Sequence, residues 1–158
     1  PVECLYNPSL RGKSVAVVDE PDFRHGIALA KNYAAKVFGV TTGNPLWMAK
    51  RKCPDIVFVP PHYDLYMKYS QMAREIYSEY IDQVEPYGLD ECWLDVTGST
   101  GLLGGGKEIS DKLRERIRAE LGVTVSVGVS YNKIFAYRRE IVNQIHRKQH
   151  YRSARPYY

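Results

Sequence analysis

The order of the elements predicted from residue 62 onward restricts the fold more than any other feature. Two stretches, residues 63–81 and 109–121, repeat apolar side chains at steps of three or four, which is typical of helices with one buried stripe. Between them, residues 84–87 and 92–96 flank a turn at Gly88 and predict a β-hairpin. Residues 124–129 alternate apolar and polar side chains and predict a last strand. The order is therefore helix, strand, strand, helix, strand.

This order is one strand short of a split βαβ sheet, which runs β-α-β-β-α-β. The pattern predicts an α+β fold, with helices on one face of an antiparallel, ferredoxin-like sheet. The strand that is lacking would come first, and we expect it to lie upstream of Pro1.

The first sixty residues have a different character, because they alternate short helices and strands. Strands are predicted at 14–18 and 55–59, where apolar and β-branched residues cluster. Helices are predicted at 27–38, an alanine-rich stretch bracketed by Gly26 and Gly39, and at 46–52 after a Gly-Asn-Pro turn. Residues after 136 are rich in Tyr and Arg, and no internal repeat is visible.

Charge and hydropathy exclude some classes of protein. The mean hydropathy is −0.39, and no apolar run approaches the roughly 18 residues that a membrane span needs. The net charge of +4 lies entirely in residues 137–158, because the first 136 residues hold 16 Lys and Arg against 17 Asp and Glu. The basic balance thus describes a tail and says little about what the folded body binds. Three cysteines without a CxxC pair favour a reducing compartment over a disulfide framework.

Adjacent acids at the predicted hairpin tip are the sharpest local feature. Asp90 and Glu91 lie in an otherwise apolar hairpin, where two like charges repel unless water solvates them or a cation neutralises them. A solvated turn is one interpretation. A site for Mg²⁺, which prefers carboxylates together with substrate phosphates, is the other. Glu85 and Asp95 flank the pair and either could be a structural carboxylate.

Longer stretches on both sides of this pair resemble one enzyme family. EPYGLDECWLDVTGS (85–99) and SVGVSYNKIFA (126–136) resemble the palm of Y-family, DNA polymerase IV-like translesion DNA polymerases of the ImpB/MucB/SamB type. NPSLRGKSVAV (7–17), YAAKVFGVTTGNP (33–45) and AKRKCPD (49–55) resemble the fingers of the same family. The resemblance is ordered and nearly continuous over residues 2–136.

The resemblance implies a domain plan and a reaction. Fingers would span residues 1–61, a ferredoxin-like palm 62–136, and a divergent basic tail 137–158. The implied activity is template-directed DNA synthesis past damage, by nucleotidyl transfer from a deoxynucleoside triphosphate to a primer 3′-hydroxyl, with two Mg²⁺ ions. The implied partners are primer–template DNA, deoxynucleoside triphosphates and a sliding clamp bound through a C-terminal region absent from this chain. No membrane partner is implied, and the implied location is the cytoplasm, at the nucleoid.

Residue by residue, the resemblance assigns roles to two pairs. Asp90 and Glu91 match the family's metal-binding carboxylates, and Tyr33 and Lys36 match the pair that grips the triphosphate of the incoming nucleotide. Ser130, Asn132 and Lys133 match a loop that opens the next helix and are interpreted as architectural. Basic tail residues are candidate DNA contacts: Arg138, Arg139, Arg147 and Lys148.

Departures from the family predict an incomplete enzyme. The family's third carboxylate lies on the opening strand, before Pro1, and Tyr137 stands where the family usually has Lys. The resemblance ends after Ala136. We therefore expect the isolated chain to be inactive, and to be destabilised unless another strand fills the gap in its sheet. Two alternatives stay open: a non-catalytic remnant that binds DNA or a partner polymerase, and a nucleotide cyclase-like palm.

Overall fold

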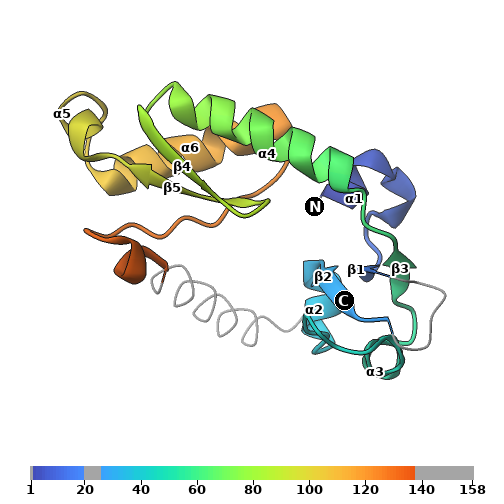
Figure 1. Cartoon of the computed structure of the whole chain (residues 1–158). Coiled ribbons are helices and arrows are strands. Elements are labelled where there is room, and N and C mark those ends of the chain that lie inside the picture. The colour runs from blue at the N-terminus through green and yellow to red at the C-terminus, as the bar shows by residue number, and fades with distance from the viewer. Residues whose placement is uncertain (1, 20–25, 138–158) are drawn as a thin grey trace, which may run out of the picture. The chain divides into compact units, whose positions relative to one another are not determined.

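The computed structural model describes residues 2–19 and 26–137. The chain divides into two units, Pro1–Tyr66 and Met67–Tyr158, and the division falls in the first turns of a long helix, α4 (Tyr63–Ser78). Each unit combines helices with a small sheet, so the fold is α+β, as the sequence predicts (Figure 1). No helix among the described residues is long and apolar enough to cross a membrane.

The first unit is built on a three-stranded sheet in the order β2-β1-β3. Strand β1 (Val15–Val18) pairs antiparallel with β2 (Ala28–Lys31) and parallel with β3 (Val57–Val59). Two short helices precede the sheet, α1 (Val2–Tyr6) and the 3₁₀ helix η1 (Pro8–Leu10), and two more connect its strands, α2 (Tyr33–Val37) and α3 (Leu46–Lys52). The predicted strand at 14–18, the helix at 46–52 and the strand at 55–59 are confirmed, the strands with shifted ends.

The helix predicted over residues 27–38 is wrong in its first half. Residues 28–31 form β2, because β1 supplies a partner for their backbone hydrogen-bonding groups. Asn32 then ends the strand and begins α2: its side-chain oxygen accepts hydrogen bonds from the backbone N–H of Ala35 (3.0 Å) and of Val15 (3.1 Å). An alanine-rich composition favours a helix, but tertiary pairing overrides that preference here.

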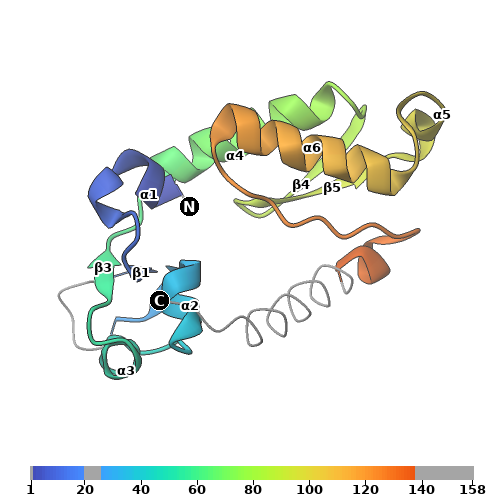
Figure 2. The same cartoon turned by 180° about the vertical axis from the view of Figure 1, so that it is seen from behind.

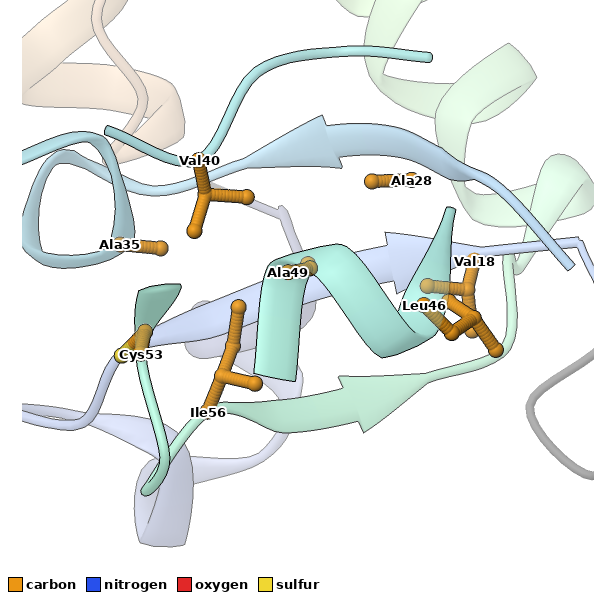
Figure 3. Packing of buried hydrophobic residues seen from close by; sticks show 9 residues of the cluster. Val18, Ala28, Ala35, Val40, Leu46, Ala49, Cys53 and Ile56 are labelled. Atoms are coloured by element: carbon orange, nitrogen blue, oxygen red, sulfur yellow. The ribbon is translucent and has the colours of Figure 1, made fainter. Parts of the chain in front are cut away.

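A core of small side chains holds the first unit together. Figure 3 shows Leu46, Ala49 and Cys53, from α3 and its end, facing apolar residues of the sheet and of α2. Ala28, Ala35 and Ala49 are fully buried. Small residues at these positions let α2 and α3 approach the sheet closely, so the outer surface of α3 is fixed relative to the strands beneath it.

One carboxylate of the first unit is buried and paired. Glu3 of α1 is 7% exposed. It accepts a hydrogen bond from the hydroxyl of Tyr66, and its Oε2 lies 2.9 Å from Nδ1 of His62. These two partners satisfy the carboxylate and join α1 to the beginning of α4.

The second unit is a hairpin covered by two helices. Strands β4 (Gln83–Tyr87) and β5 (Glu91–Asp95) pair antiparallel. The helices α4 and α6 (Gly106–Leu121) lie side by side over one face of the hairpin (Figures 1 and 2). The 3₁₀ helix η2 (Thr97–Ser99) and α5 (Thr100–Leu103) connect β5 to α6. The buried residues of the second core are Ile76, Ile81, Ile109, Leu113, Ile117 and Leu121. The predicted helices and hairpin are confirmed.

The strand predicted at 124–129 is wrong. Residues 123–130 form no ladder within the described parts of the chain. Val123 and Val125 nevertheless pack against the second core, and the exposure of 123–127 alternates as it does along a strand. Alternation thus predicts which side chains are buried, whereas a strand also needs a neighbouring backbone to pair with.

Two tyrosines predict how the stability of the fold depends on pH. Burial raises the pKa of Tyr77 to about 12; burial and the hydrogen bond to Glu3 raise the pKa of Tyr66 to about 12 as well. A folded-state pKa above the unfolded value of 10.0 means that the stabilisation is complete below pH 10 and is lost as the pH rises toward 12.

We expect the free energy of unfolding to fall between pH 10 and pH 12, by up to about 2 kcal/mol for Tyr77, whose ring is only partly buried. Tyr77→Phe should flatten this fall, and Tyr33→Phe, at a residue 63% exposed, should not. Denaturant unfolding of the three proteins from pH 8 to pH 12 measures the difference. Equal slopes for all three would contradict the assignment to Tyr77.

Candidate functional site

A three-residue turn positions the acidic pair. Strand β4 ends at Tyr87, β5 begins at Glu91, and Gly88 adopts a φ of +69° that favours glycine. Asp90 is the last residue of the turn and Glu91 the first of β5, and both are exposed. Neither carboxylate has a hydrogen bond or an ion pair to another residue of the described ranges. The pair is therefore available to a ligand.

The pairing of the strands shows which face Glu91 occupies. Residues directly opposite in an antiparallel ladder share a face, so Tyr87 and Glu91 lie on the same side as Glu85 and Trp93. Leu94 lies on the opposite side and packs against the helical core. Glu91 thus projects from the face of the hairpin that α4 and α6 leave uncovered.

An ion pair that the sequence did not predict lies on this same face. Lys133 pairs with Glu85, and its Nζ lies 5.8 Å from the centre of the Trp93 ring. The ring of Tyr87 in turn contacts that of Trp93, with centres 6.1 Å apart. Lys133 thus joins the turn of helix at 133–137 to both strands of the hairpin. The members of this group are separated by up to 48 residues in the chain, so no local sequence pattern predicts their contact.

The other predicted structural carboxylate has a local role. Asp95 accepts hydrogen bonds from the backbone N–H of Thr97 (3.0 Å) and from its hydroxyl (2.6 Å). These bonds hold the pKa of Asp95 below its usual value. Asn132 has a similar task, since its side chain accepts from the N–H of Phe135 at 2.9 Å and caps the turn of helix at 133–137. Both residues shape the backbone around the site.

The acidic pair fits part of a magnesium site. Carboxylate oxygens are the ligands that Mg²⁺ prefers, and Mg²⁺ commonly takes only one or two of them, completing its shell with water and substrate phosphates. Asp90 and Glu91 supply two such groups, exposed and without competing cations. Across residues 2–19 and 26–137, however, no three His, Cys, Asp or Glu side chains gather closely enough to hold a metal ion. The described residues thus provide two carboxylates and no third.

The second predicted pair lies in the first unit. Tyr33 and Lys36 are three residues apart on α2, and Nζ of Lys36 lies 5.4 Å from the centre of the Tyr33 ring. The Tyr33 ring is 63% exposed. A phenol and an ammonium group side by side on an exposed helix face can both reach one phosphate chain. The structure therefore brings these two residues together.

The remaining predicted contacts lie outside the described residues: Arg138, Arg139, Arg147 and Lys148. They stay predictions from the sequence.

Comparisons with known proteins identify the family to which the chain belongs. A model of the impB/mucB/samB family matches residues 1–137. The protein called DNA polymerase IV in Acetivibrio thermocellus is 61% identical over 135 residues, which are 85% of this chain and 34% of that protein. The DNA polymerase IV of Halorhodospira halophila is 41% identical over 135 residues, 85% of this chain and 38% of its own length.

Solved structures show the same fold. An insertion ternary complex of Dbh DNA polymerase superposes with a TM-score of 0.77 at 31% identity, covering 86% of this chain and 40% of that one. The crystal structure of DinB from Sulfolobus solfataricus gives a TM-score of 0.76 at 30% identity, with the same coverage. The chain spans between a third and two-fifths of the length of these relatives.

The α+β fold is thus the one that these Y-family DNA polymerase structures share over the matched residues. More particularly, the chain belongs to the impB/mucB/samB family, and it is similar to the Y-family DNA polymerases named DNA polymerase IV.

Proposed function

We propose that the chain forms the fingers and palm of a DNA-directed DNA polymerase that copies damaged templates. The first unit corresponds to the fingers and the second unit to the palm. The observation that carries the proposal is the exposed pair Asp90 and Glu91 at the end of the hairpin turn, in a chain that is 61% identical to a DNA polymerase IV over 135 residues. The substrates are primer–template DNA and deoxynucleoside triphosphates.

In this proposal, the palm residues hold metal and the fingers residues hold the nucleotide. Mg²⁺, when bound, would neutralise charge on the reacting phosphate. Asp90 and Glu91 provide its protein ligands from a turn whose backbone is fixed by the hairpin. Tyr33 donates a hydrogen bond to the triphosphate, and Lys36 places a positive charge beside it. These residues act by position and charge, which are the main contributions a protein makes to phosphoryl transfer.

A second candidate function is that of a non-catalytic protein that binds DNA or a partner polymerase. The hairpin turn carries the two adjacent acids Asp90 and Glu91, and the described residues contain no cluster of three residues that could hold a metal ion. We therefore expect no primer extension by the 158-residue chain alone.

The test is a chimera. Because this chain matches 135 residues of the Acetivibrio thermocellus enzyme at 61% identity, those residues can be replaced by the matching residues of this chain. If the proposal holds, the chimera extends a primer in the presence of Mg²⁺ and all four deoxynucleoside triphosphates, at a rate within about tenfold of the parent enzyme. A chimera that folds and binds DNA but adds no nucleotide would instead favour the non-catalytic candidate.

The fingers assignment has its own prediction. Lys36→Ala in the chimera should raise the KM for the incoming nucleotide about tenfold, since a hydrogen bond to a charged group contributes about 1.5–3 kcal/mol. Lys36→Arg keeps the charge and should recover most of the affinity. Lys13→Ala removes the same charge from an exposed residue elsewhere in the first unit and is the matched control. Steady-state kinetics with varied nucleotide measure the effect, and equal KM values for Lys36→Ala and Lys13→Ala would rule out the role of Lys36.

A further inference from the structure

The outward face of α3 carries an exposed tryptophan beside cations that the proposed nucleotide site does not use. Leu46 and Ala49 point into the core of the first unit (Figure 3). Trp47 and Arg51 lie four residues apart, so they leave the helix on one face, away from those buried positions. Trp47 is 56% exposed, although it is among the largest apolar side chains. A solvent-exposed tryptophan on a helix that is packed against a core is suited to stacking on a flat ligand.

The cations of α3 differ in how far they are engaged within the protein. Lys52 donates to the carbonyl of Gly39 and to Oδ1 of Asn44, both at 2.9 Å, and is thus structural. Lys50 reaches the carbonyl of Ile56 at 3.4 Å. Arg51 is exposed and makes no hydrogen bond or ion pair to the rest of the described chain. The charge of Arg51 is thus available to an anion.

The first unit as a whole carries a small positive charge, because residues 1–66 hold eight Lys and Arg against six Asp and Glu. Among the described residues of the first unit, the basic side chains outnumber the acidic ones. The basic residues are Arg11, Lys13, Lys31, Lys36, Lys50, Arg51 and Lys52, and the acidic residues are Glu3, Asp19, Asp55 and Asp64. Glu3 is buried and satisfied by His62 and Tyr66. A polyanion therefore meets a favourable potential at the first unit.

We propose that Trp47 and Arg51 form a binding surface for single-stranded nucleic acid: a base stacks on Trp47 while Arg51 contacts the adjacent phosphate. An aromatic platform next to a cation is the combination that binds single strands without reading sequence. A duplex offers α3 its phosphates but keeps its bases stacked on one another, so the tryptophan favours an unpaired strand. The surface rests on the proposed function, in which that strand is the template not yet copied.

Fluorescence of Trp47 tests the surface directly. The sequence holds two tryptophans, so Trp93→Phe leaves Trp47 as the sole one. Titration of this 158-residue protein with a 15-nucleotide oligothymidylate should quench the fluorescence. Arg51→Ala should weaken the affinity about tenfold and reduce the slope of log K against log salt by about 0.7. The matched control is Lys68→Ala, an exposed cation of the second unit, which should change the affinity less than twofold.

Several outcomes would overturn the surface. If the fluorescence of Trp47 stayed constant while a labelled oligonucleotide became fully bound, the contact would lie elsewhere. If Arg51→Ala and Lys68→Ala weakened binding equally, general attraction between charges would explain the binding. If a duplex of the same length quenched the fluorescence as strongly as the oligothymidylate, the surface would have no preference for an unpaired strand. If polyglutamate did so, the surface would have no preference for nucleic acid.

The same titration separates this inference from the proposed function. Asp90→Ala removes a proposed metal ligand and should leave the quenching unchanged, because binding at α3 requires no catalysis. Conversely, Trp47→Ala in the chimera should keep primer extension at saturating DNA while raising the DNA concentration needed for half-maximal rate. Quenching without extension by the chimera would preserve the surface and reject the polymerase assignment; extension without quenching would do the reverse.

Discussion

Asp90→Ala in the chimeric polymerase should reduce the rate of nucleotide addition at least about 10³-fold, because a metal ion contributes several kcal/mol of charge stabilisation to such a reaction. Asp90 has no hydrogen bond to any other described residue, so its removal breaks nothing in the hairpin. We therefore expect the melting temperature to stay within about 2 °C of the unsubstituted chimera. Single-turnover primer extension at several Mg²⁺ concentrations measures the loss.

Two further variants separate metal binding from a general effect of charge. Asp90→Asn keeps the shape of the side chain and removes its charge, and it should lose nearly as much activity as Asp90→Ala. Asp82→Ala removes an exposed acid of the second unit outside the hairpin strands and should retain activity within about threefold. Equal activity of Asp90→Asn and the unsubstituted chimera would show that the carboxylate binds no metal, and the assignment of Asp90 would be abandoned.

Elements whose pattern is local were predicted well from the sequence. The helices α4 and α6 each bury one stripe at helical spacing, and Gly122 ends α6 with a φ of +67°. The hairpin is likewise local, since its turn and both strands lie within thirteen residues. The acidic pair at its tip followed from the same reasoning, because a turn exposes whatever side chains it carries.

Elements that depend on a distant partner were not predicted. Residues 28–31 are a strand because β1 lies beside them, whereas their composition favours a helix. Residues 124–129 have the alternation of a strand but no neighbour within the described chain to pair with. The ion pair between Glu85 and Lys133 joins distant parts of the chain and has no local signal. In each case, the periodicity of a segment does not show which distant segment it pairs with.

The largest effect on folding should come from the core of the second unit. Ile117 of α6 is fully buried, in the cluster that also contains Ile76 of α4. Ile117→Ala removes three carbon atoms and leaves a cavity, which costs about 2–5 kcal/mol in measured cases. Because the free energy of unfolding of a domain is only about 5–15 kcal/mol, we expect a substantial fraction of the Ile117→Ala molecules to be unfolded at physiological temperature.

Graded substitutions make this expectation specific to packing. Ile117→Val removes a single carbon and should cost about 0.5–1.5 kcal/mol, so the two variants should order by the volume they remove. Leu102→Ala is the matched control, because Leu102 is 92% exposed and its loss should change the stability by less than about 0.5 kcal/mol. Denaturant unfolding followed by circular dichroism gives all three values. If Ile117→Ala cost no more than Leu102→Ala, the helices would not be packed around Ile117, and the hairpin that carries Asp90 and Glu91 would lack the support assigned to it here.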